Sequence, residues 1–163
     1  HFNPMVTLAF AIRRAMPRGE TIPFVVVQVV AALLAGMLCL WSAPVVGDDP
    51  AAKLPLQIQP LPATIFEFLF TFALVTVILN VALSRRQRDN QFYGLAVGMV
   101  VLAGAYVAGP VSGAAFNPAV TVALGTMGLA EWSDVWSHFA GQVTGGLLAV
   151  AAFTATERGD GPE

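Results

Sequence analysis

Hydrophobic residues gather in four long runs along the chain, with polar residues between them. The runs cover roughly residues 23–41, 65–83, 92–111 and 136–154. Each has close to the about 20 residues that an α-helix needs to cross the hydrocarbon core of a bilayer. The alternating pattern of transmembrane β-strands is absent from the sequence. Because a helix satisfies its own backbone hydrogen bonds in lipid, the pattern predicts an all-α membrane protein with four spanning helices.

Two further apolar segments, residues 4–12 and 118–129, are too short to span a bilayer. As helices they extend about 14 and 18 Å, whereas the bilayer core is about 30 Å thick. Each begins with Asn-Pro, and asparagine before a proline at the first helical position is a strong helix-start signal. We therefore expect two short helices that begin at Pro4 and Pro118.

An internal repeat relates the two short segments. Residues 2–9 (FNPMVTLA) and 116–123 (FNPAVTVA) are identical at six of eight positions, at a constant offset of 114. Three long runs separate the two copies, and this odd number makes them enter the membrane from opposite faces. Oppositely oriented repeats with short helices are typical of inverted-repeat channels and transporters. The expected architecture is therefore an inverted repeat of four spanning helices and two re-entrant half-helices.

The Asn-Pro segments also predict a chemistry at the centre of the membrane. The small residues of 109–116 allow that stretch to fold into the membrane where it lines a cavity. Asn117 then caps one half-helix, and Asn3 caps the other from the opposite side. Two half-helices that meet at their N-termini place two positive dipole ends, about half a charge each, near the midplane. This field disfavours cations, whereas the asparagine amides donate hydrogen bonds to neutral polar molecules.

The composition excludes several classes of function. Charged residues make up 11% of the chain, against about 25% in soluble domains. Ten acidic and eight basic residues nearly cancel, so nothing indicates a nucleic-acid partner. His1, His138 and Cys39 show no metal-ligand spacing, and no nucleophile is grouped with an acid–base pair. The sequence therefore predicts no enzyme, cofactor or metal site, with Cys39 a packed thiol and His138 at a helix mouth.

Basic residues predict the orientation in the membrane. The segment Arg13–Arg18, the loop Arg85–Arg88 and the C-terminus together hold seven of the eight bases, and only Lys53 falls on the other side. The positive-inside rule makes the seven-base side cytoplasmic. The proline-rich stretch 42–62 is then an irregular external loop. We expect a multi-pass protein of the cell membrane.

At this point the residues resemble a known family, the aquaporins and related major intrinsic proteins. The twin signature is Asn3-Pro4-Met5 and Asn117-Pro118-Ala119, and the string SGAAFNPAVT over 112–121 is highly characteristic. Further similar positions are Gln28, Glu67, Gly141, Gly145 and Gly146.

The resemblance implies a single aquaporin-like channel domain over residues 1–163. Its function would be passive passage of water and other small neutral solutes, and the full-length parent would be a homotetramer. The chain begins at the first signature, so the two helices that precede it in the family are expected to be missing. The alternative is a non-conducting membrane scaffold or a degenerate channel fragment.

The resemblance also places an outer selectivity filter. Its positions match Val120, Ala105 and Ala114, where family members commonly carry arginine at the first and histidine or glycine at the second. The implied filter is small, apolar and uncharged. Thr121 replaces the aspartate of typical glycerol channels, whereas Phe139 fits the water-channel pattern.

Glu67 is the charged residue inside a long apolar run, and two roles stay open for it. An intramembrane carboxylate is a functional hypothesis by default, and a proton relay is one such role. The resemblance implies structural support instead, with the carboxylate accepting hydrogen bonds from a re-entrant loop. The glycine pairs Gly94-x-x-x-Gly98 and Gly141-x-x-x-Gly145 are interpreted as close-packing surfaces.

Overall fold

The computed structural model describes residues 1–45 and 56–158, and within these ranges all regular structure is helical. The helices are α1 (Pro4–Ile12), η1 (Arg18–Glu20), α2 (Thr21–Ser42), α3 (Pro60–Leu83), η3 (Arg85–Gln87), α4 (Tyr93–Ser112), α5 (Pro118–Thr126) and α6 (Val135–Arg158). Of these, α2, α3, α4 and α6 are long and apolar enough to cross a membrane. The chain is thus an all-helical membrane protein. The middle of the proline-rich stretch, including Lys53, and the C-terminal residues 159–163 lie outside the described residues.

Three helix ends differ from the expected ranges by three residues or more. Helix α3 begins at Pro60 rather than near residue 65, because proline stands at the first position after an extended Gln59. Helix α5 ends at Thr126 rather than at residue 129, because the chain turns at Gly128, whose φ is +69°. Helix α6 continues to Arg158, about one turn beyond the expected end.

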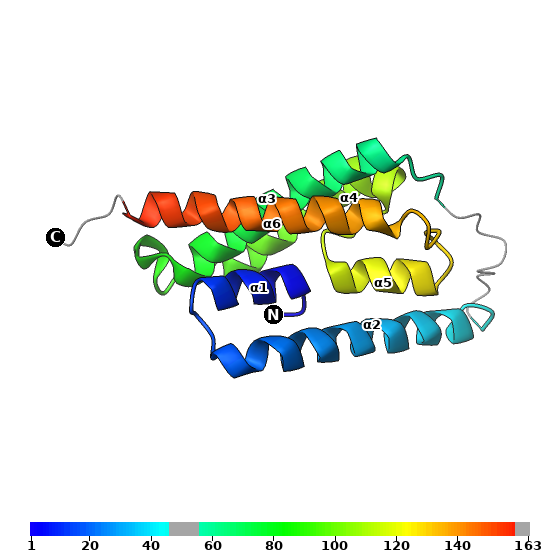
Figure 1. Ribbon diagram of the computed structural model, residues 1–163, viewed down its shortest axis with the longest axis horizontal. Coiled ribbons are helices and arrows are strands. Elements are labelled where there is room, and N and C mark those ends of the chain that lie inside the picture. Colours follow the sequence, from blue (N-terminus) through cyan, green and yellow to red (C-terminus); the bar gives the residue numbers. More distant parts are fainter. Residues whose placement is uncertain (46–55, 159–163) are drawn as a thin grey trace.

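The two short helices lie in line between two long ones. Figure 1 shows α1 and α5 end to end, with α2 on one side and α6 on the other. Both short helices contact α2 and α6. The start of α1 and the start of α5 therefore face each other in the middle of the molecule, and the two helices point away from that place.

Helices α3 and α6 form the most extensive helix pair, and glycine permits their close approach. A Cβ added to Gly141 would come within 2.9 Å of the backbone nitrogen of Phe68, and one added to Gly145 within 3.1 Å of the nitrogen of Phe72. Gly94 and Gly98 on α4 have open space around them within the described residues. The close-packing interpretation thus fits contacts inside the chain for the α6 pair and not for the α4 pair.

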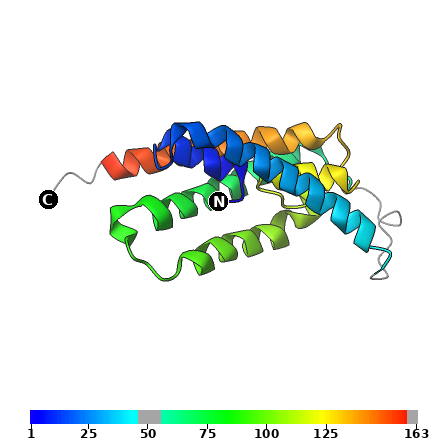
Figure 2. The same ribbon diagram turned by 90° about the horizontal axis from the view of Figure 1, so that it is seen from below.

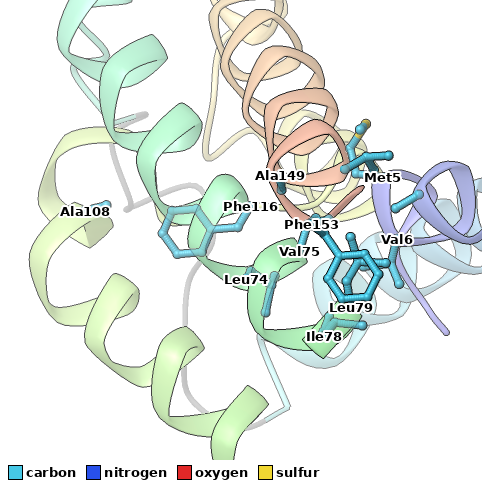
Figure 3. Packing of buried hydrophobic residues seen from close by; sticks show 12 residues of the cluster. Met5, Val6, Leu74, Val75, Ile78, Leu79, Ala108, Phe116, Ala149 and Phe153 are labelled. Atoms are coloured by element: carbon cyan, nitrogen blue, oxygen red, sulfur yellow. The ribbon is translucent and has the colours of Figure 1, made fainter. Parts of the chain in front are cut away.

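The main hydrophobic core ties α1 to α3 and α6. Figure 3 shows Phe153 of α6 next to side chains of α3, with Met5 and Val6 of α1 on the other side. Phe116, from the loop before α5, lies at the far end of the same cluster and contacts the ring of Phe70. The core therefore holds one half-helix directly and reaches the loop before the other.

Helices α2 and α4 turn apolar side chains outward. Figure 2 shows α4 standing to one side of the bundle, next to α3. Only 11% of the most apolar window of each of these two helices is buried inside the chain. Apolar surface of this extent suits a lipid or protein environment rather than water.

The basic segments gather at one end of the bundle. The α1–α2 connection, the α3–α4 connection and the end of α6 lie together in Figure 1. Two side-chain hydrogen bonds join them: Ser84 Oγ donates to Glu157 at 2.9 Å, and Arg13 Nη1 donates to Thr154 at 2.9 Å. The Arg13 guanidinium also lies 5.1 Å from the ring centre of Phe153.

Candidate pore site

Each signature asparagine caps its own short helix. The side-chain oxygen of Asn3 accepts from the backbone nitrogen of Met5 at 2.9 Å, and that of Asn117 accepts from Ala119 at 3.0 Å. Both asparagines have extended backbones, and a proline follows at the first helical position. Both helices therefore begin in the same way, with an asparagine cap followed by proline. In each, the cap fixes the direction of the side-chain amide.

The two amides also cross from one half to the other. Asn3 Nδ2 donates to the backbone oxygen of Phe116 at 2.9 Å, and Asn117 Nδ2 donates to that of Phe2 at 3.1 Å. Each acceptor is the residue just before the opposite asparagine, so the pair is symmetric. We call these two contacts the crossed amide bonds. They join the N-terminal ends of α1 and α5 without any side chain of a third helix.

The three residues that the resemblance assigns to an outer filter are apolar and differ in exposure. Val120, in the first turn of α5, is 40% exposed. Ala105 of α4 is exposed and Ala114 of the loop is half-buried. Thr121 is fully buried, so it faces away from the surface that Val120 presents. No charged group stands at any of these positions.

Glu67 of α3 is fully buried and holds the loop before α5. One carboxylate oxygen accepts from Ser112 Oγ at 2.6 Å and from the backbone nitrogen of Ala115 at 3.0 Å. The other accepts from the nitrogen of Phe116 at 2.7 Å and from Gln142 Nε2 at 2.8 Å. Four donors from three parts of the chain thus converge on one carboxylate. Each hydrogen bond to a charged group is worth about 1.5–3 kcal/mol.

These bonds maintain a strained loop. Ala114 and Phe116 have φ angles of +52° and +47°, a left-handed conformation that costs a side-chain-bearing residue about 1 kcal/mol or more. In this conformation the backbone nitrogens of Ala115 and Phe116 face Glu67. The loop therefore keeps a shape that its own backbone preferences oppose.

His138 lies in the first turn of α6, at the end of a helix as the sequence predicts. It is fully buried there, and its Nε2 lies 2.7 Å from the backbone oxygen of Ser112. A carbonyl only accepts, so Nε2 carries the proton in this contact. The imidazole therefore holds the last residue of α4, directly before the loop that Glu67 holds. Cys39, expected to be packed, is exposed on α2.

Two glutamines near the site escaped the sequence analysis as a pair. Gln28 Nε2 donates to Thr7 Oγ1 at 2.9 Å, and Gln142 Nε2 donates to Thr121 Oγ1 at 2.8 Å. The signal was available, because Gln28 and Gln142 stand at the same offset of 114 as the asparagines. The close repeat covers residues 2–9 and 116–123 and does not reach the long helices, so it does not by itself pair the two glutamines. Within the described ranges, no group of three or more His, Cys, Asp or Glu side chains could hold a metal.

Comparison with known proteins places the chain in a family. The sequence model of the major intrinsic proteins matches residues 1–153. Aquaporin NIP1-1 of Oryza sativa subsp. japonica is 35% identical over 158 residues, which cover 94% of this chain and 53% of the relative. Nodulin-26 of Glycine max is 31% identical over 162 residues, 99% of this chain and 59% of the relative. Aquaporin NIP1-1 of Zea mays is 36% identical, with 94% and 53% covered.

The chain therefore spans about half the length of the curated relatives it matches. The matched residues 1–153 nevertheless include both Asn-Pro signatures, helices α2, α3 and α4, most of α6, and the loop before α5 that Glu67 holds. The chain belongs to the major intrinsic protein family.

Proposed function

We propose that this chain forms part of a passive transmembrane channel for water and other small neutral solutes. The observation that carries the proposal is the pair of crossed amide bonds, which bring the starts of two oppositely directed half-helices together. Relatives that match over most of this chain are named aquaporins. Their names and the paired signature support the same activity here.

The crossing has the electrostatics that such a channel needs. Each half-helix presents the positive end of its dipole, about half a charge, at its first turn. Two such ends at one place repel cations, including a hydrated proton. Each asparagine amide also has two N–H donors, of which the crossed bond uses one. The second donor of each amide is suited to a passing water or hydroxyl oxygen.

The filter residues shape the range of solutes. An arginine at the outer filter supplies a fixed positive charge and several donors, whereas Val120 supplies neither. Ala105 and Ala114, which the resemblance assigns to the same filter, are also small and uncharged, so the proposed opening is wider and less polar than an arginine filter. We propose that neutral solutes somewhat larger than water pass, and that cation exclusion depends mainly on the crossing.

Glu67 serves in this proposal as structural support rather than as a proton relay. Its two oxygens already accept four hydrogen bonds from the loop, Ser112 and Gln142. A relay needs a partner to which the proton moves on, whereas the groups around Glu67 are donors that hold the loop in place. The channel thus needs no coupled ion and no cofactor.

The setting follows from the outer surfaces. Basic segments at one end of the bundle fit a cytoplasmic face under the positive-inside rule, in a multi-pass protein of the cell membrane. The outward apolar faces of α2 and α4 fit lipid or neighbouring subunits, and we propose a homotetramer for the full-length parent.

Osmotic shrinkage of liposomes that contain the chain tests the proposal. Stopped-flow light scattering should show water permeability above that of protein-free liposomes of equal size, with no rise in proton conductance. A matched sample with E67L, in which the loop loses its support, serves as a control for leaks caused by inserted protein. Water permeability equal to that of protein-free liposomes contradicts the channel and favours the non-conducting scaffold.

A further inference from the structure

The two buried glutamines form equivalent contacts in the two halves. In each half, a long helix supplies a glutamine whose Nε2 donates to a threonine four residues after the signature asparagine. Each threonine in turn has its hydroxyl 3.2 Å from the backbone oxygen of that asparagine. Glutamine, threonine and asparagine therefore form a series of hydrogen bonds, which we call a relay although no proton is transferred along it. The series is Gln28–Thr7–Asn3 in one half and Gln142–Thr121–Asn117 in the other.

The direction of each relay is fixed by an acceptor that cannot donate. Gln28 Nε2 also contacts the backbone oxygen of His1 at 2.9 Å, and Gln142 Nε2 contacts the Glu67 carboxylate at 2.8 Å. A backbone carbonyl and a carboxylate oxygen only accept, so the amide nitrogen must face them in both cases. The amide then donates to the threonine oxygen, which leaves the hydroxyl proton free for the asparagine carbonyl.

The second relay has fewer alternatives than the first. The Thr7 hydroxyl also lies 2.8 Å from His1 Nδ1 and 3.3 Å from Gln28 Oε1, so several acceptors share it. For Thr121 the structure gives the Asn117 oxygen as the acceptor. The Oε1 atom of Gln142 is buried without a partner among the described residues, a cost of about 1–3 kcal/mol. Gln142 keeps this orientation because its Nε2 donates to Glu67 and to Thr121. Its role is therefore that of a hydrogen-bond donor.

A threonine hydroxyl bonded to the carbonyl four residues earlier is ordinary in helices. Thr144 makes the same bond to Ala140, at 2.6 Å, on an exposed part of α6. What distinguishes Thr7 and Thr121 is full burial and a glutamine donor from another helix. Thr144 is therefore a control with the same local chemistry and no relay.

We propose that Gln28 and Gln142 are positioning residues, each of which holds the signature asparagine of its half through a threonine. In the second half, Gln142 also joins this relay to Glu67, so one carboxylate positions the residues on both sides of Asn117. The effect of these glutamines on transport rests on the proposed function, in which the asparagines are the groups that a passing solute meets. Their positioning of the asparagines does not depend on conduction.

Backbone amide exchange at the two caps tests the proposal. The nitrogens of Met5 and Ala119 donate to the oxygens of Asn3 and Asn117, so their exchange by NMR reports each asparagine separately. We expect Q142L and T121V to speed exchange at Ala119 about fivefold and to change Met5 by less than about twofold. Q28L and T7V should do the reverse, with a smaller effect for T7V because its hydroxyl is shared.

Conservative and control variants separate positioning from general stability. T121S keeps the hydroxyl and should restore slow exchange at Ala119, whereas T144V should leave both caps unchanged. Equal acceleration at Met5 and Ala119 in every variant, or no rescue by serine, overturns the proposal. If Q142L fails to fold, the T121V and T121S pair still decides. The exchange result does not depend on conduction, so a chain that passes no water leaves this test intact.

Discussion

The two half-helices share a sequence and a cap, yet different forces hold them. Val6 of α1 is 2% exposed in the main core, whereas Val120, its counterpart in α5, is 40% exposed. Helix α1 is fixed by apolar packing against α3 and α6. The start of α5 is fixed by hydrogen bonds, through a strained loop held by Glu67. The comparison teaches that the same motif can be held by apolar packing in one half and by hydrogen bonds to a buried carboxylate in the other.

Under the proposed function, this difference restricts the selectivity filter to the second half. A residue buried among core side chains cannot meet a solute, so the position after the first signature is restricted to packing. The position after the second signature is open, and its side chain can change without disturbing the core. The predictions below test this division, from the largest expected effect to the smallest.

Arginine at the two counterpart valines should separate the halves most clearly. V6R buries an unpaired charge in the core and should destabilise the chain by about 3–5 kcal/mol, whereas V120R points into open space and should fold. Thermal unfolding in mild detergent measures both. Equal stability of the two variants contradicts the division between a packed and an open half.

The V120R variant also tests the filter. The added charge and bulk should reduce uptake of small polyols into liposomes and leave water permeability less affected. The unmodified chain, reconstituted at the same density, is the control. Unchanged polyol uptake, or none in either version, argues against the wide filter.

Removal of the Glu67 carboxylate is the next largest change. E67L leaves backbone nitrogens of Ala115 and Phe116 and the amide of Gln142 without their acceptor, at a cost of about 3 kcal/mol. Helix α1 should stay protected in amide exchange while the loop before α5 opens. E157L is the control, because Glu157 accepts a side-chain hydrogen bond from Ser84 near the end of α6, away from the loop. Equal effects of both substitutions would show that Glu67 has no special role.

Glycine replacement probes the packing that supports both halves. G145A places a methyl group against the backbone of α3 and should destabilise by about 1–3 kcal/mol. G98A on α4 meets open space and should be neutral or slightly stabilising, since alanine favours helix. Chemical denaturation of the two variants checks this, and a harmless G145A excludes the tight α3–α6 contact.

The two asparagines should give the smallest and most nearly equal effects. N3A and N117A each lose a helix cap, which costs about 0.5–2 kcal/mol. Because each also loses one crossed amide bond, the double variant tests whether the two bonds stabilise each other. A large difference between the single variants would break the symmetry seen at the crossing.

Much of this architecture can be predicted from the sequence, because hydropathy and Asn-Pro caps are local signals. The four long runs give the membrane helices, and Pro4 and Pro118 mark the two short ones. The contacts of Gln142 and His138 are different, since they depend on the α3–α6 packing that brings distant residues to one loop. The burial of Val6 against the exposure of Val120 is likewise a tertiary property, because the two valines sit in nearly identical sequence.

The crossed amide bonds are the central claim, and solid-state NMR in lipid bilayers measures them directly. The sample needs asparagine labelled with 15N in the side chain alone and phenylalanine labelled with 13C at the carbonyl. The structure predicts two dipolar couplings, from Asn3 to Phe116 and from Asn117 to Phe2. The other two asparagine amides donate to carbonyls of Thr76, Val81 and Gln87, so they stay silent. Two short-range couplings support the account, and their absence in folded protein contradicts it.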